Sequence, residues 1–331
     1  MKPLQGCLVL DFSTLLPGPL ATLLLAEAGA DVMTIERPGS EEMASLAQLN
    51  RGKTRLALDL KNPDDRTRLQ PLLERADVIV EQFRPGVMDR LGLAYDDVAA
   101  RNPRIVYCSI TGYGQHGPKS GVAGHDLNYI GDTGLLSLSM GTPSNPVIPP
   151  ALMADIAGGS YPAVINILLA LRERDRTGRG RHLDVSMTDN LFTLMIGSSI
   201  ITGGSPRYRL YPTRDGKMLA VGALEQKFWD VFCDIANLDP ALRDEARDPR
   251  ATAARVAEIV AGETADTWAR RIEGRDCCCS IVATVTEAMN DPHFAARGLF
   301  QDRRTSAHDD APPALPVPLD PAFKAAGTQV D

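Results

Sequence analysis

The first third of the chain alternates short apolar runs with helical patterns, and this alternation limits the fold more than any other feature of the sequence. Continuous apolar strands separated by amphipathic helices are typical of a parallel sheet that helices cover on both faces. The sequence therefore predicts an α/β fold with a doubly wound, Rossmann-like sheet. We expect strands at 7–11, 31–36, 56–60, 77–83 and 104–110, helices at 19–28 and 63–75, and helical turns at 87–91 and 95–100.

The turn that follows the first predicted strand lacks the glycines of a dinucleotide site. Its residues, 15–19, read LLPGP, whereas the GxGxxG pattern places glycines where a pyrophosphate lies against the start of the helix. The sequence therefore predicts a Rossmann-like sheet without NAD as a cofactor.

The composition of the chain changes after the predicted sheet. Glycine-rich loops are expected at 111–124 and 141–150, and apolar helices at 156–174 and 189–201. The residues GGSP at 203–206 have the composition of a linker.

A length of 331 residues suggests two domains of about 150 residues each. We predict a large α/β domain over residues 1–200 and a smaller α+β domain over 205–300. The tail at 301–331 is rich in proline and alanine towards its end and is a candidate to return to the large domain. Within the smaller domain we expect a strand at 217–222 and helices from 225, at 251–260 and at 264–272.

Composition and charge limit the possible partners. A 44% hydrophobic fraction is enough to fill two cores, and a net charge of −7 argues against a general binder of nucleic acid or anionic membranes. The uncharged run at 133–154 contains four prolines, so it cannot be a spanning helix. Asp11 interrupts the first apolar stretch, which is unlike a signal peptide. We expect a cytoplasmic protein with no nucleic-acid partner and no membrane partner.

The six cysteines do not suggest a metal site. Three of them are adjacent, at 277–279, and adjacent side chains cannot converge on one ion as spaced CxxC pairs do. The sequence therefore predicts reduced thiols and no metal.

Three polar clusters lie where loops meet predicted helices or strands. They are GHDLNY at 124–129, MADIAGG at 153–159 and GALE at 222–225. Their His125, Asp155 and Glu225 are candidate acids and bases, because such positions are rigid and partly exposed. Asp155 is expected to be a helix N-cap, with backbone N–H groups behind it open to an oxyanion. The residues alone leave a plainer reading open, in which Asp155 only caps a helix and His125 only bonds within a loop.

These clusters, together with other segments, resemble the family III CoA-transferase superfamily (CaiB/BaiF type) and, within it, the α-methylacyl-CoA racemase branch. GHDLNY and GALE point to that branch. The resemblance is dense from about residue 4 to 190 and patchy from 205 to 300. The other matching segments are VLDFS at 9–13, LPGP at 16–19, LAEAGADV at 25–32, IERPG at 35–39, NRGK at 50–53, LDLK at 58–61, FRPGV at 83–87 and SITGYG at 109–114.

The resemblance implies that His125 and Asp155 are two bases on either side of the substrate α-carbon. It implies that Glu225 pairs with the His125 imidazole and that Asp126 assists nearby. Racemisation fits such a pair, since one base removes the α-proton and the other, initially protonated, returns a proton to the opposite face. A carboxylate beside an imidazole fixes its tautomer and favours its charged form.

The resemblance also implies a site for the CoA moiety of the substrate, and no other cofactor. CoA is polyanionic, and a group of basic residues follows the first strands, at Arg37, Arg51, Lys53, Arg55, Lys61, Arg84 and Arg90. At least half of that group is expected to be solvated surface. The residues assigned to CoA binding are Arg37, Leu58, Lys61, Arg84, Gly124, Asn128 and Tyr129.

The family pattern implies a homodimer whose two chains interlock. Each active site then lies between the large domain of one chain and the small domain of the other, and Glu225 reaches His125 across that interface. The chain is shorter than the family pattern at the 203–206 linker and after Arg304.

The expected reaction interconverts (R)- and (S)-2-methylacyl-CoA thioesters through an enolate. The alternative is a family III CoA-transferase, in which Asp155 attacks the thioester and forms a mixed anhydride. A third possibility is a CoA-binding protein without catalysis, whose mark would be loss of a catalytic residue.

Overall fold

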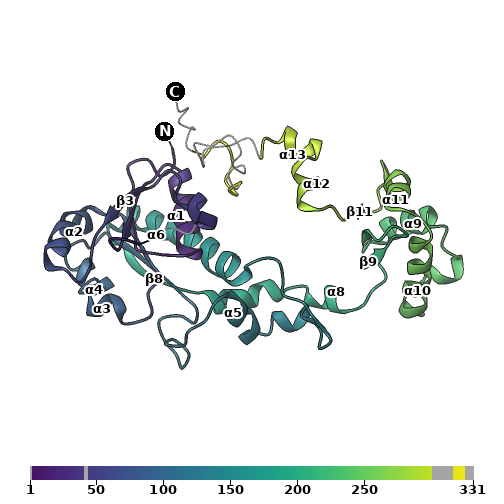
Figure 1. Cartoon of the computed structure of the whole chain (residues 1–331), viewed down its shortest axis with the longest axis horizontal. Coiled ribbons are helices and arrows are strands. Elements are labelled where there is room, and N and C mark those ends of the chain that lie inside the picture. The colour runs from purple at the N-terminus through teal and green to yellow at the C-terminus, as the bar shows by residue number, and fades with distance from the viewer. Residues whose placement is uncertain (1, 41–43, 300–315, 325–331) are drawn as a thin grey trace. The chain divides into compact units, whose positions relative to one another are not determined.

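The computed structural model describes residues 2–40, 44–299 and 316–324 of the chain (Figure 1). These residues form two compact units, each with its own hydrophobic core. Of the described residues, the first unit contains 2–40, 44–196 and 316–324, and the second contains 197–299.

The first unit is built on a six-stranded parallel sheet, which confirms the predicted α/β fold. The strand order is β3-β2-β1-β4-β5-β8, so the order reverses between β1 and β4. Ligands of such sheets bind beyond the carboxyl ends of the strands at the point of reversal. The strands are β1 (Leu8–Asp11), β2 (Asp31–Glu36), β3 (Thr54–Ala57), β4 (Val78–Glu81), β5 (Val106–Thr111) and β8 (Arg181–Ser186).

Helices cover both faces of this sheet (Figure 1). Helices α1 (Pro17–Glu27) and α6 (Tyr161–Thr177) pack on one face and α2 (Pro63–Arg75) on the other. The central strand β4 supplies both cores, since Val78 and Val80 face α1 and α6 whereas Ile79 faces α2. Its side chains are apolar on both sides, which explains why the sequence reads there as a continuous apolar run.

The long apolar helix predicted at 156–174 begins earlier and in a different form. Residues Ala154–Ser160 form a π-helix, η3, which continues into α6. Helix α6 ends at Thr177, and Gly178 follows it as the C-cap with φ 73°. The single helix predicted at 189–201 is wrong. The segment is divided into α7 (Met187–Leu191), the 3₁₀ helix η4 (Phe192–Met195) and α8 (Ser198–Thr202), because Gly197 has φ 83°, which no right-handed helix accommodates.

Shorter elements complete the first unit. The described part of the tail packs on it, since Val317 and Leu319 contact a cluster that contains Leu23 and Leu24 of α1; the rest of the predicted tail, 301–315 and 325–331, lies outside the described residues. The shorter elements are α3 (Val87–Arg90), α4 (Tyr95–Ala99), α5 (Asp126–Asp132), η1 (Ala44–Asn50), η2 (Leu136–Leu138), β6 (Gly141–Thr142) and β7 (Asn145–Pro146).

The second unit is α+β. A three-stranded antiparallel sheet, in the order β11-β10-β9, packs on helices around Trp229, Phe232 and Trp268, which are all fully buried. Of its strands the sequence predicted only β10. The elements are β9 (Tyr208–Pro212), β10 (Met218–Gly222), α9 (Gln226–Ile235), η5 (Pro240–Leu242), α10 (Pro249–Ala261), α11 (Ala265–Ile272), β11 (Cys279–Ile281), α12 (Val285–Met289) and α13 (Pro292–Ala296).

Among the described residues, one helical stretch, Ala154–Thr177, is long and apolar enough to cross a membrane by length and composition alone. Buried helices of globular cores pass the same test, and Ala163, Ile167 and Ala170 of this stretch are buried against the sheet.

Candidate active site

Asp155 lies in the first turn of the π-helix η3 and is half-buried. Its backbone N–H donates to Oδ1 of Asp126 at 3.0 Å, and the N–H of Ala154 donates to the same oxygen at 2.6 Å. Asp126 is 5% exposed and begins α5. Its carboxylate therefore caps the helix that carries Asp155.

The expectation that Asp155 is the N-cap of its helix is wrong. Met153, not Asp155, occupies the N-cap position. The backbone N–H groups of Ala154 and Asp155 are not open to an oxyanion, because Asp126 already accepts from both. The cap comes from a side chain 28 or 29 residues away, which a local pattern in the sequence does not reveal.

His125 is exposed and lies immediately before α5. Its backbone N–H donates to Oδ1 of Asn128 at 3.0 Å, and the N–H of Asn128 donates to its carbonyl oxygen at 2.8 Å. The hydroxyl of Tyr129 donates to the carbonyl oxygen of Gly124 at 2.6 Å. A Cβ at Gly124 would lie 2.6 Å from the Tyr129 ring, so this close contact requires glycine. These bonds fix the loop that presents His125.

Several candidate residues of the first unit affect one another's pKa values. Burial raises the pKa of Asp155 to about 6, the negative charge of Asp126 adds to this, and His125 acts in the opposite direction. Burial also raises the pKa of Tyr129, with a contribution from Asp155 that Arg84 opposes. A carboxyl group with a pKa near 6 can exchange protons at physiological pH, which is what a general acid or base must do.

A cavity of about 790 Å³ lies at the carboxyl edge of the sheet. Three of the residues assigned to CoA binding line it, namely Arg37, Leu58 and Lys61. Its volume is in the range of cofactor sites. Its position matches the reversal of strand order, since Phe12 follows β1 and Phe83 follows β4.

Arg84 does not line this cavity. It lines a second, smaller cavity of about 350 Å³ together with Glu81, His116 and His182. Arg90 lines the large cavity instead. A helical spacing is the signal that would have found Arg90, because Val87, Arg90 and Leu91 are spaced i, i+3 and i+4 and all three line the cavity.

Two further basic residues of the group after the first strands are not available to a polyanion. The side chain of Lys53 is 0% exposed and its Nζ lies 3.1 Å from Oδ2 of Asp11. Nε of Arg51 lies 2.7 Å from Oε1 of Glu27, and both side chains are buried. Burial lowers the pKa of Lys53, while the neighbouring Asp11 carboxylate acts in the opposite direction.

Glu225 lies in the second unit. It is exposed, it follows β10, and it occupies the N-cap position of α9. Its pairing with His125 stays a prediction. No group of three or more His, Cys, Asp or Glu side chains suited to a metal ion occurs in the part of the chain that the structure describes.

The sequence as a whole matches a model of the family described as CoA-transferase family III over residues 4–326. The chain belongs to CoA-transferase family III. Members of this family with different activities are similar to it. The human α-methylacyl-CoA racemase is 34% identical over 97% of this chain and 89% of the human protein. The succinyl-CoA:glutarate CoA-transferase of Mus musculus is 34% identical over 75% of this chain and 62% of that protein.

The fold also matches solved structures of family III. The crystal structure of Rv3272 from M. tuberculosis has a TM-score of 0.82 and 29% sequence identity, and the match covers 90% of this chain and 88% of that chain. The chain is therefore an enzyme of the family III CoA-transferase/racemase superfamily, with both kinds of activity among its relatives.

Proposed function

We propose that this enzyme racemises 2-methylacyl-CoA thioesters, with His125 and Asp155 as its two bases. The observation that carries the proposal is the half-buried Asp155 carboxyl group, whose pKa is raised to about 6 and which lies within electrostatic reach of His125. One group with a pKa near neutrality beside an imidazole supplies a base and an acid in the same site.

The proposed reaction starts with removal of the α-proton by the deprotonated base. The C–H bond breaks, the proton moves to the base, and the electron pair passes to the thioester oxygen as an enolate. The opposite, protonated base then delivers a proton to the other face of the α-carbon. No electrons are gained or lost, so the reaction requires neither NAD nor another redox cofactor.

We propose that the CoA moiety occupies the large cavity. Arg37, Lys61 and Arg90 bring positive charge to it, which suits phosphate groups. Phe12, Ile35 and Leu58 supply an apolar wall for a flat, uncharged part of the ligand.

We also propose an interlocked homodimer. Helix α6 exposes an apolar stripe of Tyr161, Ile165, Leu168 and Leu169, with 38 to 63% of each side chain accessible. The spacing i, i+4, i+7 and i+8 places these residues on one face of the helix, and an exposed apolar face of this kind is typical of a protein–protein interface. A second copy of the chain would cover it and would bring the partner's Glu225 to His125.

A CoA-transferase is the second candidate, because a transferase is also 34% identical, although over 75% of this chain against 97% for the human racemase. In that reaction the Asp155 carboxylate attacks the thioester carbon, CoA leaves as the thiolate, and a mixed anhydride forms. Such a mechanism needs no second base on the far face of an α-carbon.

Incubation with a 2-methylacyl-CoA in deuterated water, with and without a free carboxylic acid, separates these reactions. We expect one deuterium at the α-carbon and loss of optical purity without added acid. Acyl exchange with the free acid and no α-deuterium would show a transferase. Binding of the thioester with neither outcome would show a protein that binds CoA without these reactions.

A further inference from the structure

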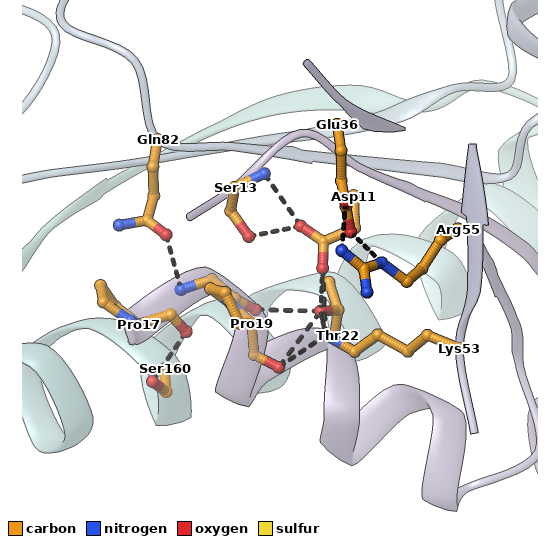
Figure 2. Close-up of polar contacts among 11 residues, drawn as sticks. Asp11, Ser13, Pro17, Pro19, Thr22, Glu36, Lys53, Arg55, Gln82 and Ser160 are labelled. Carbon is orange, nitrogen blue, oxygen red and sulfur yellow. Dashed lines mark hydrogen bonds and ion pairs between the residues drawn. The ribbon is translucent and has the colours of Figure 1, made fainter. Parts of the chain in front are cut away.

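We infer that the buried ion pair between Asp11 and Lys53 positions the proposed active site, an inference that rests on the proposed function. Neither residue lines the large cavity or belongs to the clusters around His125 and Asp155. They are therefore positioning residues. They hold the segment 13–19 (Figure 2), whose residues line the cavity and bond to the helix that carries Asp155.

The ammonium group of Lys53 has a complete set of partners. Nζ lies 3.1 Å from Oδ2 of Asp11, and it donates to the carbonyl oxygen of Pro19 at 2.9 Å and to Oγ1 of Thr22 at 2.7 Å. The Lys53 and Asp11 side chains are 0% and 1% exposed. Each proton of the ammonium thus points to a defined acceptor, and one of these acceptors is the backbone at the end of the segment.

The carboxylate of Asp11 holds the other end of the segment. Oδ1 accepts the backbone N–H of Ser13 at 2.9 Å and also the Ser13 hydroxyl. Oδ2 accepts the hydroxyl of Thr22, which lies in the second turn of α1. The pair therefore fixes the segment at both ends and joins it to α1.

One side of the segment faces the large cavity. Ser13, Thr14, Leu15 and Pro19 line it. Leu15 has φ 62°, a backbone conformation that leucine rarely adopts, so its surroundings must hold it. A shift of the segment would change the wall of the proposed CoA site.

The other side of the segment holds the helix of Asp155. The Ser160 hydroxyl donates to the carbonyl oxygen of Pro17 at 2.8 Å (Figure 2). It also lies 3.1 Å from the carbonyl oxygen of Asp155. The backbone N–H of Gly18 donates to Oε1 of Gln82 at 2.9 Å. The segment therefore contacts the lining of the large cavity, the end of β4 and the π-helix. The buried ion pair fixes the position of the segment among these three.

We assign this positioning role to the ion pair because its hydrogen bonds have defined directions, and not only because it contributes to stability. A buried ion pair often stabilises a protein no better than apolar residues of similar volume. Hydrogen bonds with defined directions fix a loop in one geometry, and small displacements of reacting groups cost large factors in rate.

The test compares Lys53→Met and the milder Thr22→Val with a matched control, Arg174→Met. Nη1 of Arg174 forms an ion pair with Asp77 at 2.8 Å on the same sheet, beside the start of β4 instead of the carboxyl end. For Lys53→Met we expect kcat to fall about 10- to 100-fold and the Kd for CoA to rise several-fold, with smaller changes of the same kind in Thr22→Val. The control should lose thermal stability but keep kcat and the Kd for CoA within about twofold.

Hydrogen exchange gives a readout that does not depend on the reaction. Lys53→Met should speed amide exchange in both 13–19 and 154–160, and Arg174→Met should not. If Lys53→Met fails to fold, the double variant Asp11→Asn/Lys53→Met, which leaves no unpaired charge, takes its place with the same expectations. Unchanged kcat, unchanged CoA affinity and unchanged exchange in a folded variant would overturn the inference. An inactive wild-type enzyme would overturn the proposed function instead, and the exchange pattern would still decide the positioning role.

Discussion

Asp126 fixes the position of Asp155 and adds to the effect of burial on the Asp155 pKa. Its carboxylate accepts the N–H groups of Ala154 and Asp155, and its charge contributes to the raised pKa of the Asp155 carboxyl. The same contact thus anchors the proposed base and brings its pKa towards neutrality.

Replacing either proposed base should stop racemisation. Asp155→Ala and His125→Ala should each lower kcat by about 10²- to 10⁴-fold, because each removes one proton-transfer group. The Kd for CoA should stay close to that of the wild type, since the large cavity contains neither residue. α-Deuterium exchange and calorimetric CoA titration measure the two effects. A His125→Ala enzyme with normal turnover would favour the transferase reaction.

The pH dependence should report the state of Asp155. Asp155 accepts a proton only in its deprotonated form, so the rate in the direction where it acts as the base should fall as the pH drops through about 6. Burial of Asp155 remains in Asp126→Asn, but the negative charge that further raises the Asp155 pKa is removed, while Oδ1 still accepts both N–H groups. The acidic limb of the kcat/KM profile should therefore move to lower pH. A limb that stays in place would mean that another group controls it.

At the scale of single elements, the carboxylate of Asp126 does for η3 what a local N-cap does for other helices. Asp126→Ala leaves the N–H groups of Ala154 and Asp155 without this acceptor, and an unsatisfied buried N–H costs about 1–3 kcal/mol. The free energy of unfolding should fall accordingly in urea titrations. Asp126→Asn should lose much less, and equal losses in the two variants would contradict the capping role.

Which elements the sequence predicted depended on how local their signals are. The strand and helix at 31–36 and 63–75 have the predicted bounds, because apolar runs, Pro63 and the Asn62 cap that accepts the N–H of Asp64 act locally. Strand β11 has only three residues, within and after the cysteine run, which is too short for a periodic signal. The strand predicted at 56–60 ends at Ala57 in the structure. Leu58 lies after the strand and is nevertheless buried, with 1% exposed, because its side chain packs into the core.

The same distinction applies to the candidate site. The resemblance assigns Arg37, Leu58 and Lys61 to CoA binding, and all three line one cavity in the structure. Arg84 lies on another cavity because it sits in the loop before α3, three residues ahead of the helix face that meets the large cavity. The link from Lys53 to Asp11 joins residues 42 positions apart, so only the folded chain reveals it.

At the scale of the whole molecule, a shared active site can be tested by mixing two inactive chains. In the proposed dimer each site combines Asp155 and His125 of one chain with Glu225 of the other. Co-expressed Asp155→Ala and Glu225→Ala chains should form heterodimers in which one site carries both lesions and the other is intact. Up to half of the wild-type activity per heterodimer should return in the deuterium-exchange assay. Sites built from a single chain would give no recovery, and sedimentation of a folded monomer would also contradict the interlocked dimer.

The π-helix η3 makes the number of residues ahead of α6 part of the active-site geometry. A π-turn holds one more residue than an α-turn, and such turns often occur at functional sites. Deleting one residue after Asp155 and before Tyr161 would let this stretch wind as an α-helix, in which each N–H bonds four residues back instead of five. The tighter turn would narrow the helix where Asp126 accepts the N–H groups of Ala154 and Asp155, although every residue named as a base is still present. A change in the length of this stretch, and not only a substitution, should therefore lower the activity of this chain.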